Sequence, residues 1–65
     1  MESISITLGS INDNRTVAAI CGDDGRWRIW LMGRDGVTPD EDRTPHKRGY
    51  TTFDSARRAW RRHYT

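Results

Sequence analysis

The residues best suited to molecular recognition are two arginines and a tryptophan that alternate in one short stretch, Arg26, Arg28 and Trp30. In an extended strand, successive side chains point to opposite faces, so these three share one face. Planar guanidinium groups hydrogen-bond phosphates, base edges and carboxylates, and an indole ring stacks on flat groups. The spacing therefore predicts a binding surface.

A second set of cations lies near the end of the chain and recurs at helical spacing. Its members are Arg57, Arg58, Arg61 and Arg62. We expect them to form one basic ridge on a helix, with Lys47 and Arg48 adding charge just before it. Asp54 can pair with Arg58 four residues on, and cations near the C-terminal end favour the helix dipole, so a purely structural role is open as well.

The residue types needed for catalysis or metal binding do not come together in a recognisable pattern. His46 falls in a loop and His63 on the last helical turn, positions typical of surface residues. The acidic run Asp40 to Asp42 stands between prolines and is typical of solvated charge. Without a placed nucleophile, a glycine-rich phosphate loop or zinc-ligand spacing, we expect no enzyme activity, no metal and no cofactor.

Length and charge bound the class of protein. A chain of 65 residues with 34% hydrophobic residues can cover one sheet face with one helix. The net charge of +2 is uneven: residues 1–42 hold four basic and eight acidic groups, and residues 43–65 hold seven and one. One cysteine, no leader and no long apolar run predict an unprocessed cytoplasmic protein without a membrane partner.

The central element is a β-hairpin between residues 16 and 32. Gly22-Asp23-Asp24-Gly25 predicts a type I turn followed by a left-handed glycine, which fixes the register. The inner, apolar face then pairs Cys21 with Trp27, Ala19 with Ile29 and Val17 with Leu31. The outer face pairs Ile20 with Arg28, Ala18 with Trp30 and Thr16 with Met32. We expect Cys21 to be a small buried hydrophobe.

The remaining segments complete one βββα domain over residues 1–65. Alternation in residues 2–8 predicts a first strand whose inner face carries Ile4, Ile6 and Leu8. Residues 33–49 read as a long loop, with room for a short fourth strand around Lys47 to Thr51. A helix capped by Thr52 or Asp54 then runs to Tyr64. The sequence thus predicts an α+β fold: a three-stranded antiparallel sheet with one C-terminal helix packed on one face.

Two stretches carry a family resemblance: Gly25 to Leu31, GRWRIWL, and Gly49 to Ala56, GYTTFDSA. In this order they resemble the small βββα DNA-binding modules of the AP2 and integrase arm-binding type. In that family an Arg- and Trp-bearing sheet reads the DNA major groove, and an aromatic residue before a Ser or Asp cap docks the helix. The resemblance implies Arg26, Arg28 and Trp30 as the groove-facing set, and Phe53, Ala56 and Trp60 as packing residues.

These observations favour a non-enzymatic nucleic-acid-binding domain. Its candidate binding residues are Arg26, Arg28, Trp30, Lys47, Arg48, Arg57, Arg58, Arg61 and Arg62. One alternative stays open: a small accessory or inhibitory factor, of the kind found in phages and mobile elements, that docks on a partner protein or forms a homodimer through the same surface. Continuous basic surface favours nucleic acid, whereas apolar and acidic neighbours around Trp30 favour a protein partner.

Overall fold

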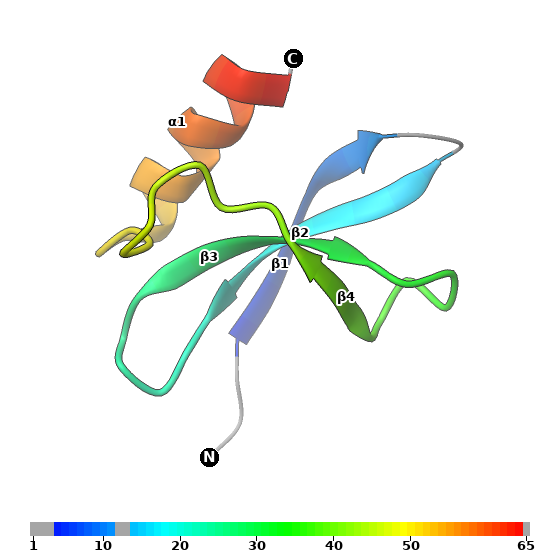
Figure 1. Cartoon of the computed structure of the whole chain (residues 1–65), viewed down its shortest axis with the longest axis horizontal. Coiled ribbons are helices and arrows are strands. Elements are labelled where there is room, and N and C mark those ends of the chain that lie inside the picture. The colour runs from blue at the N-terminus through cyan, green and yellow to red at the C-terminus, as the bar shows by residue number, and fades with distance from the viewer. Residues whose placement is uncertain (1–3, 12–13, 65) are drawn as a thin grey trace.

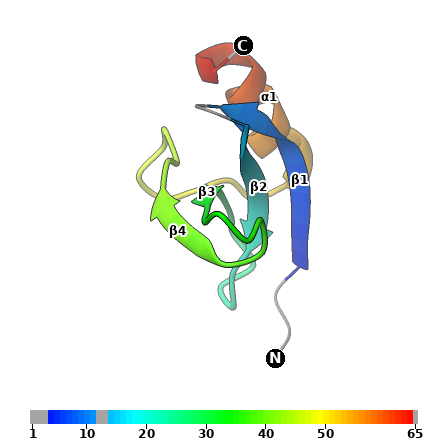
Figure 2. The ribbon, with the colours of Figure 1, turned by 90° about the vertical axis from the view of Figure 1, so that its right-hand side faces the viewer.

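The computed structural model describes residues 4–11 and 14–64. Its elements are β1 (Ile4–Ile11), β2 (Arg15–Cys21), β3 (Trp27–Met32), β4 (Pro39–Asp42) and α1 (Phe53–Tyr64). The strands form one antiparallel sheet in the order β1-β2-β3-β4. The sheet is strongly twisted, and α1 lies against one face of it (Figures 1 and 2). The predicted α+β architecture is confirmed.

The hairpin of β2 and β3 has the predicted register. Gly25 is left-handed, with a φ of 77°, and the Gly22 N–H donates to the Arg26 carbonyl at 2.9 Å. Asp24 accepts a hydrogen bond from the Arg26 N–H at 3.0 Å, which closes the turn. The observed pairs are Val17 with Leu31, Ala18 with Trp30, Ala19 with Ile29, Ile20 with Arg28, and Cys21 with Trp27. This turn therefore places Arg28 and Trp30 on the face away from the core.

The fourth strand lies earlier in the chain than predicted. β4 pairs with the second half of β3, and of the range around Lys47 to Thr51 only Tyr50 forms an isolated bridge, to Trp27. Between these two pairings the Thr44 hydroxyl accepts a hydrogen bond from the Ile29 N–H at 3.0 Å. Proline and acidic residues have low strand propensity. The backbone N–H and C=O groups on the free side of β3 nevertheless require hydrogen-bond partners, and the segment from β4 to Tyr50 supplies them.

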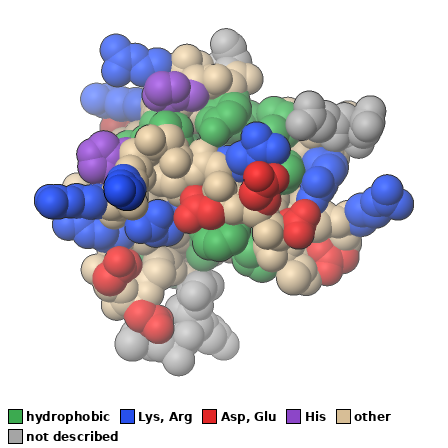
Figure 3. Space-filling view, viewed as in Figure 1, with side chains coloured by type: hydrophobic (Ala, Val, Ile, Leu, Met, Phe, Trp, Pro, Cys, Tyr) green, Lys and Arg blue, Asp and Glu red, His purple; other side chains and the backbone are tan. Residues whose placement is uncertain are grey.

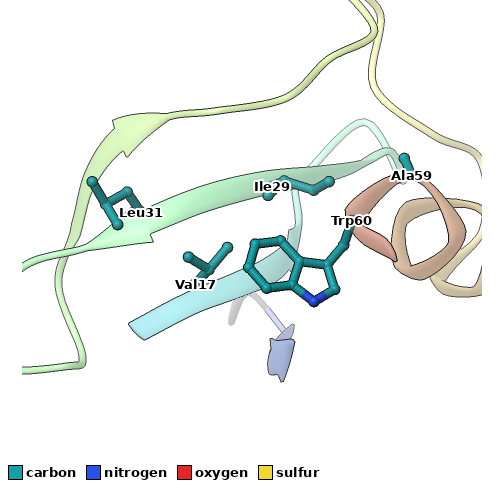
Figure 4. Packing of buried hydrophobic residues seen from close by; sticks show 5 residues of the cluster. All are labelled: Val17, Ile29, Leu31, Ala59 and Trp60. Carbon is teal, nitrogen blue, oxygen red and sulfur yellow. The ribbon is translucent and has the colours of Figure 1, made fainter. Parts of the chain in front are cut away.

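The hydrophobic core lies between α1 and the sheet (Figure 4). Its buried side chains are Val17, Ile29, Leu31, Ala59 and Trp60. Trp60 points from α1 toward the strands and is 5% exposed, as expected for the residue that covers the core. Helix residues thus seal the sheet where α1 contacts β2 and β3.

The start of α1 is fixed by Thr52, one of the two predicted caps. Its hydroxyl accepts a hydrogen bond from the Ser55 N–H at 3.1 Å, which satisfies a backbone donor of the first turn. Phe53 packs edge-on against Trp27, with ring centroids 5.4 Å apart. The Tyr64 hydroxyl donates to the Arg43 carbonyl at 2.6 Å and fixes the other end of α1.

In the described part of the chain, α1 is too short and too polar to span a lipid bilayer.

Burial departs from the prediction in β1 and at the end of β2. Ile4 and Ile6 are 58% and 39% exposed, because α1 covers β2 and β3 and leaves this end of β1 open. Cys21 is half-buried rather than buried. On the outer face, Ala18 is 2% exposed and lies between its larger register partners Thr7 and Trp30.

Candidate functional site

Trp30 and the two hairpin arginines line a shallow groove of about 540 Å³, here called the sheet-face groove. Its other lining residues are Ile20, Gly22, Asp23, Asp24 and Pro39. Trp30 is half-buried, so its ring is neither sealed in the core nor fully exposed. The groove therefore combines cations, an aromatic ring, aliphatic surface and two carboxylates.

The two sheet-face arginines differ in their partners. The Arg28 Nη1 lies 3.4 Å from the Asp42 Oδ2, and its Nη2 donates to the Lys47 carbonyl at 3.0 Å. Arg26 has no carboxylate within ion-pair distance in the described part of the chain. Arg28 is thus held by the protein itself, while the Arg26 guanidinium is free to bind a ligand.

Each carboxylate of the acidic strand β4 forms an ion pair with one arginine. The pairs are Asp40 with Arg15 at 2.6 Å, Glu41 with Arg43 at 3.2 Å and Asp42 with Arg28 at 3.4 Å. Within residues 4–11 and 14–64, no cluster of His, Cys, Asp or Glu is arranged to hold a metal ion. Each carboxylate of β4 is therefore paired with an arginine, and the cations without such a partner lie outside β4.

A second hollow, of about 660 Å³, lies between α1 and the loop 45–50 and is here called the helix–loop groove. The helix contributes Ser55, Arg58, Ala59, Arg62 and His63. The loop contributes Pro45, His46 and Tyr50. The helical residues share one face because they recur at spacings of three and four. No acidic residue is among these lining residues of the described chain.

The groups in the helix–loop groove suit an anionic ligand. Arg62 has no carboxylate partner among the described residues, and Arg58 shares Asp54 with Arg57 at 3.0 and 3.2 Å. One carboxylate therefore faces two guanidinium groups. Burial raises the pKa of the Tyr50 phenol, which keeps it protonated as a hydrogen-bond donor. The His46 ring lies 5.9 Å from the Tyr50 ring and completes an aromatic wall.

Gly49 joins the two grooves. Its φ is 76°, and a Cβ there would lie 2.9 Å from the Trp27 carbonyl oxygen and within 3.6 Å of the Arg26 and Arg28 side chains. This close approach brings the preceding loop residues next to the sheet arginines. Figure 3 shows Lys and Arg side chains and both histidines gathered over α1 and this loop. The basic edge is defined here as Arg26, Lys47, Arg48, Arg58 and Arg62.

The structure divides the predicted helix ridge. Arg58 and Arg62 line the helix–loop groove, whereas Arg57 and Arg61 are not among its lining residues. Sequence reasoning missed the other four polar residues of this groove, His46, Tyr50, Ser55 and His63, and also Pro45 and Ala59. The signal for the helical members was present, because Ser55, Arg58 and Arg62 are spaced as one helix face. The loop members carried no such signal.

Comparison with known proteins finds no matching family model and no significant match among curated proteins or solved structures. Functional assignment therefore depends on the two grooves, their charges and the loop that joins them.

Proposed function

We propose that this domain is a non-enzymatic, cytoplasmic nucleic-acid-binding module whose basic edge contacts phosphates. The observation that supports this most is the helix–loop groove, which two arginines and two histidines line and which the loop 47–49 joins to the sheet face. The proposal requires no cofactor. It keeps the predicted function and shifts the centre of binding from Trp30 toward α1.

The chemistry of the groove fits a phosphodiester chain. Arginine forks bind phosphate oxygens through paired hydrogen bonds, and no carboxylate among the described residues occupies the fork of Arg62. The Tyr50 phenol and the Ser55 hydroxyl can add uncharged donors. The rings of His46 and Tyr50 offer flat surfaces on which an unpaired base can stack.

The sheet face adds a second contact in this proposal. Phosphate contacts position a protein on nucleic acid, and contacts to base edges give sequence preference. Arg26 and Trp30 lie on the outer face of the central hairpin of the four-stranded sheet, where an arginine can contact base edges and an indole can stack on a base. The resemblance to βββα modules supports the same use of these residues.

The proposal is tested by fluorescence anisotropy with labelled duplex DNA, single-stranded DNA and RNA over a series of salt concentrations. Four cations of the basic edge have no ion-pair partner among the described residues: Arg26, Lys47, Arg48 and Arg62. If each contacts one phosphate of a duplex, log affinity should fall against log salt with a slope of about −3.6. Replacing Lys47 and Arg62 by alanine together should reduce the slope by about 1.8.

The matched control is Arg34→Ala. Arg34 is exposed, has no ion pair in the described chain, and follows β3 at the end opposite Arg26. It removes one positive charge away from the basic edge, where the double variant removes two, and its slope should stay near that of the wild type. Absence of binding to all three nucleic acids at low salt, or an equal loss in Arg34→Ala, would contradict the proposal.

A second candidate function, docking on a partner protein, is favoured by the composition of the sheet-face groove. Ile20, Trp30 and Pro39 form an aliphatic and aromatic wall beside Asp23 and Asp24. Tryptophan and arginine in such a setting are typical of protein interfaces. This function corresponds to the accessory or inhibitory factor considered above.

A pull-down from the native cell separates the two functions. Wild type and Trp30→Ala should be compared with the Lys47 and Arg62 double alanine variant, with and without nuclease. Protein partners that survive nuclease and disappear only with Trp30→Ala favour protein docking. Partners lost with nuclease and with the double variant favour nucleic acid.

A further inference from the structure

The two edges of the sheet have opposite chemical character. The outer edge of β4 carries Pro39 and three carboxylates, which are the residues that keep sheet edges from pairing with other chains. β1 forms the other edge, and its eight residues, ISITLGSI, include no charged residue and no proline. The β4 edge is therefore protected by charge and proline, whereas β1 has neither, and its one irregularity lies between Thr7 and Gly9, beyond Ile4 and Ile6.

β1 also presents uncovered apolar side chains. Ile4 and Ile6 are 58% and 39% exposed and pair with Cys21 and Ala19, so they lie on the face that bears the core. Farther along β1, Trp60 of α1 packs on Gly9. The helix thus covers β1 near Gly9 and leaves Ile4 and Ile6 beside unpaired backbone groups of the sheet edge.

We propose that β1 pairs antiparallel with β1 of a second copy of this chain, which joins two sheets into one eight-stranded sheet. A twofold axis at Ile6 sets this residue opposite its own copy, Ile4 opposite Leu8, and Ser5 opposite Thr7. Because the axis passes through a residue, apolar side chains of both copies fall on the same face and polar ones on the other. Ile6 then covers Ile6 of the second copy, and Ile4 covers its Leu8.

A second copy is the occupant that the strand fits because β1 is self-complementary. No like charges meet when it pairs with itself, and the twofold arrangement repeats the same favourable contact. None of the residues that line the two grooves comes from β1, so the dimer leaves both grooves accessible. The interface is short, and we expect the dimer to dissociate on dilution.

The test is sedimentation velocity over micromolar to millimolar protein. Wild type should show a reversible monomer–dimer equilibrium. Ile6→Lys and Ile6→Glu should each weaken the dimer by about tenfold or more, because like charges meet at the twofold axis. Mixing the two variants should restore a heterodimer, since opposite charges then face each other.

Val37→Lys is the control. Val37 is 76% exposed and lies between β3 and β4, outside the proposed interface, so this variant should dimerise like the wild type. Circular dichroism confirms that each variant is folded. A wild type that stays monomeric throughout, or a dimer that both Ile6 variants leave intact, would overturn the proposal. Nucleic-acid binding is measured separately and can fail without affecting this result.

Discussion

The indole of Trp60 packs directly on the backbone of Gly9. A Cβ added at Gly9 would lie 2.9 Å from the Trp60 Cζ2, closer than carbon atoms approach without displacement. The contact joins β1 to the last element of the chain, and it occurs just after the irregularity that shifts the β1–β2 register between Thr7 and Gly9. The absence of a side chain at Gly9 therefore lets the helix approach the edge of the sheet.

Gly9→Ala should lower the free energy of unfolding by about 1–3 kcal/mol, because the ring of Trp60 must move away from the strand. Urea denaturation followed by tryptophan fluorescence measures this change. Ser10→Ala is the control, since Ser10 is exposed in the same strand. Equal stabilities of the two variants would show that the helix accommodates a methyl group.

Thr52→Ala should destabilise the protein by about 1 kcal/mol, because the Ser55 N–H loses the hydroxyl that accepts its hydrogen bond. Thr51→Ala tests the same chemical change at an exposed neighbour and should have an effect below about 0.5 kcal/mol. Thermal unfolding followed by circular dichroism compares the two. A larger loss in Thr51→Ala would mean that the helix starts elsewhere.

Asp42→Asn should strengthen nucleic-acid binding, because it removes the charge that holds Arg28 while its amide oxygen can still accept a hydrogen bond from the Thr44 N–H. If the released Arg28 gains a phosphate contact, the slope of log affinity against log salt should steepen by about 0.9. Anisotropy on the same oligonucleotides measures the slope.

Asp40→Asn is the matched control for this experiment. It changes net charge equally but frees Arg15, which donates to the Met32 carbonyl and is not part of the basic edge. A uniform gain in both variants would attribute the effect to net charge alone and would count against a role of Arg28.

Asp35 should titrate near pH 2. Hydrogen bonds from the Thr38 hydroxyl and from the backbone N–H groups of Thr38 and Val37 lower its pKa from 3.8 to about 2. Because the folded-state pKa lies below the unfolded value, this carboxylate stabilises the fold above about pH 4, and the contribution is lost as pH falls through 2. Thr38→Val removes the largest cause and should raise the pKa, which NMR titration of the carboxyl carbon measures.

The hairpin could be predicted from the sequence because its register depends on local turn chemistry. Two glycines around two aspartates fix which residues pair, and the observed pairs from Val17 to Cys21 follow. The helix and its Thr52 cap could also be predicted, because both depend on local sequence. These elements place Arg28 and Trp30 on the outer face before any long-range contact is considered.

The fourth strand and the helix–loop groove could not be predicted in the same way. β4 forms from residues of low strand propensity because β3 offers an open edge, a requirement that comes from the tertiary structure. The groove depends on the path of the loop 45–50, which the left-handed Gly49 turns back toward β3. Periodicity carries no information on such a path, so His46 and Tyr50 were not assigned to a site.

The ion pairs between β4 and the arginines also leave the charge unevenly distributed over the molecule. The carboxylates of Asp40 and Asp42 are paired with Arg15 and Arg28, whereas Lys and Arg side chains gather over α1 and the loop before it. A polyanion approaching from any side would exert a torque that turns this side toward it before contact. Orientation would then be decided at a distance, and the first collision would already be close to the docked arrangement.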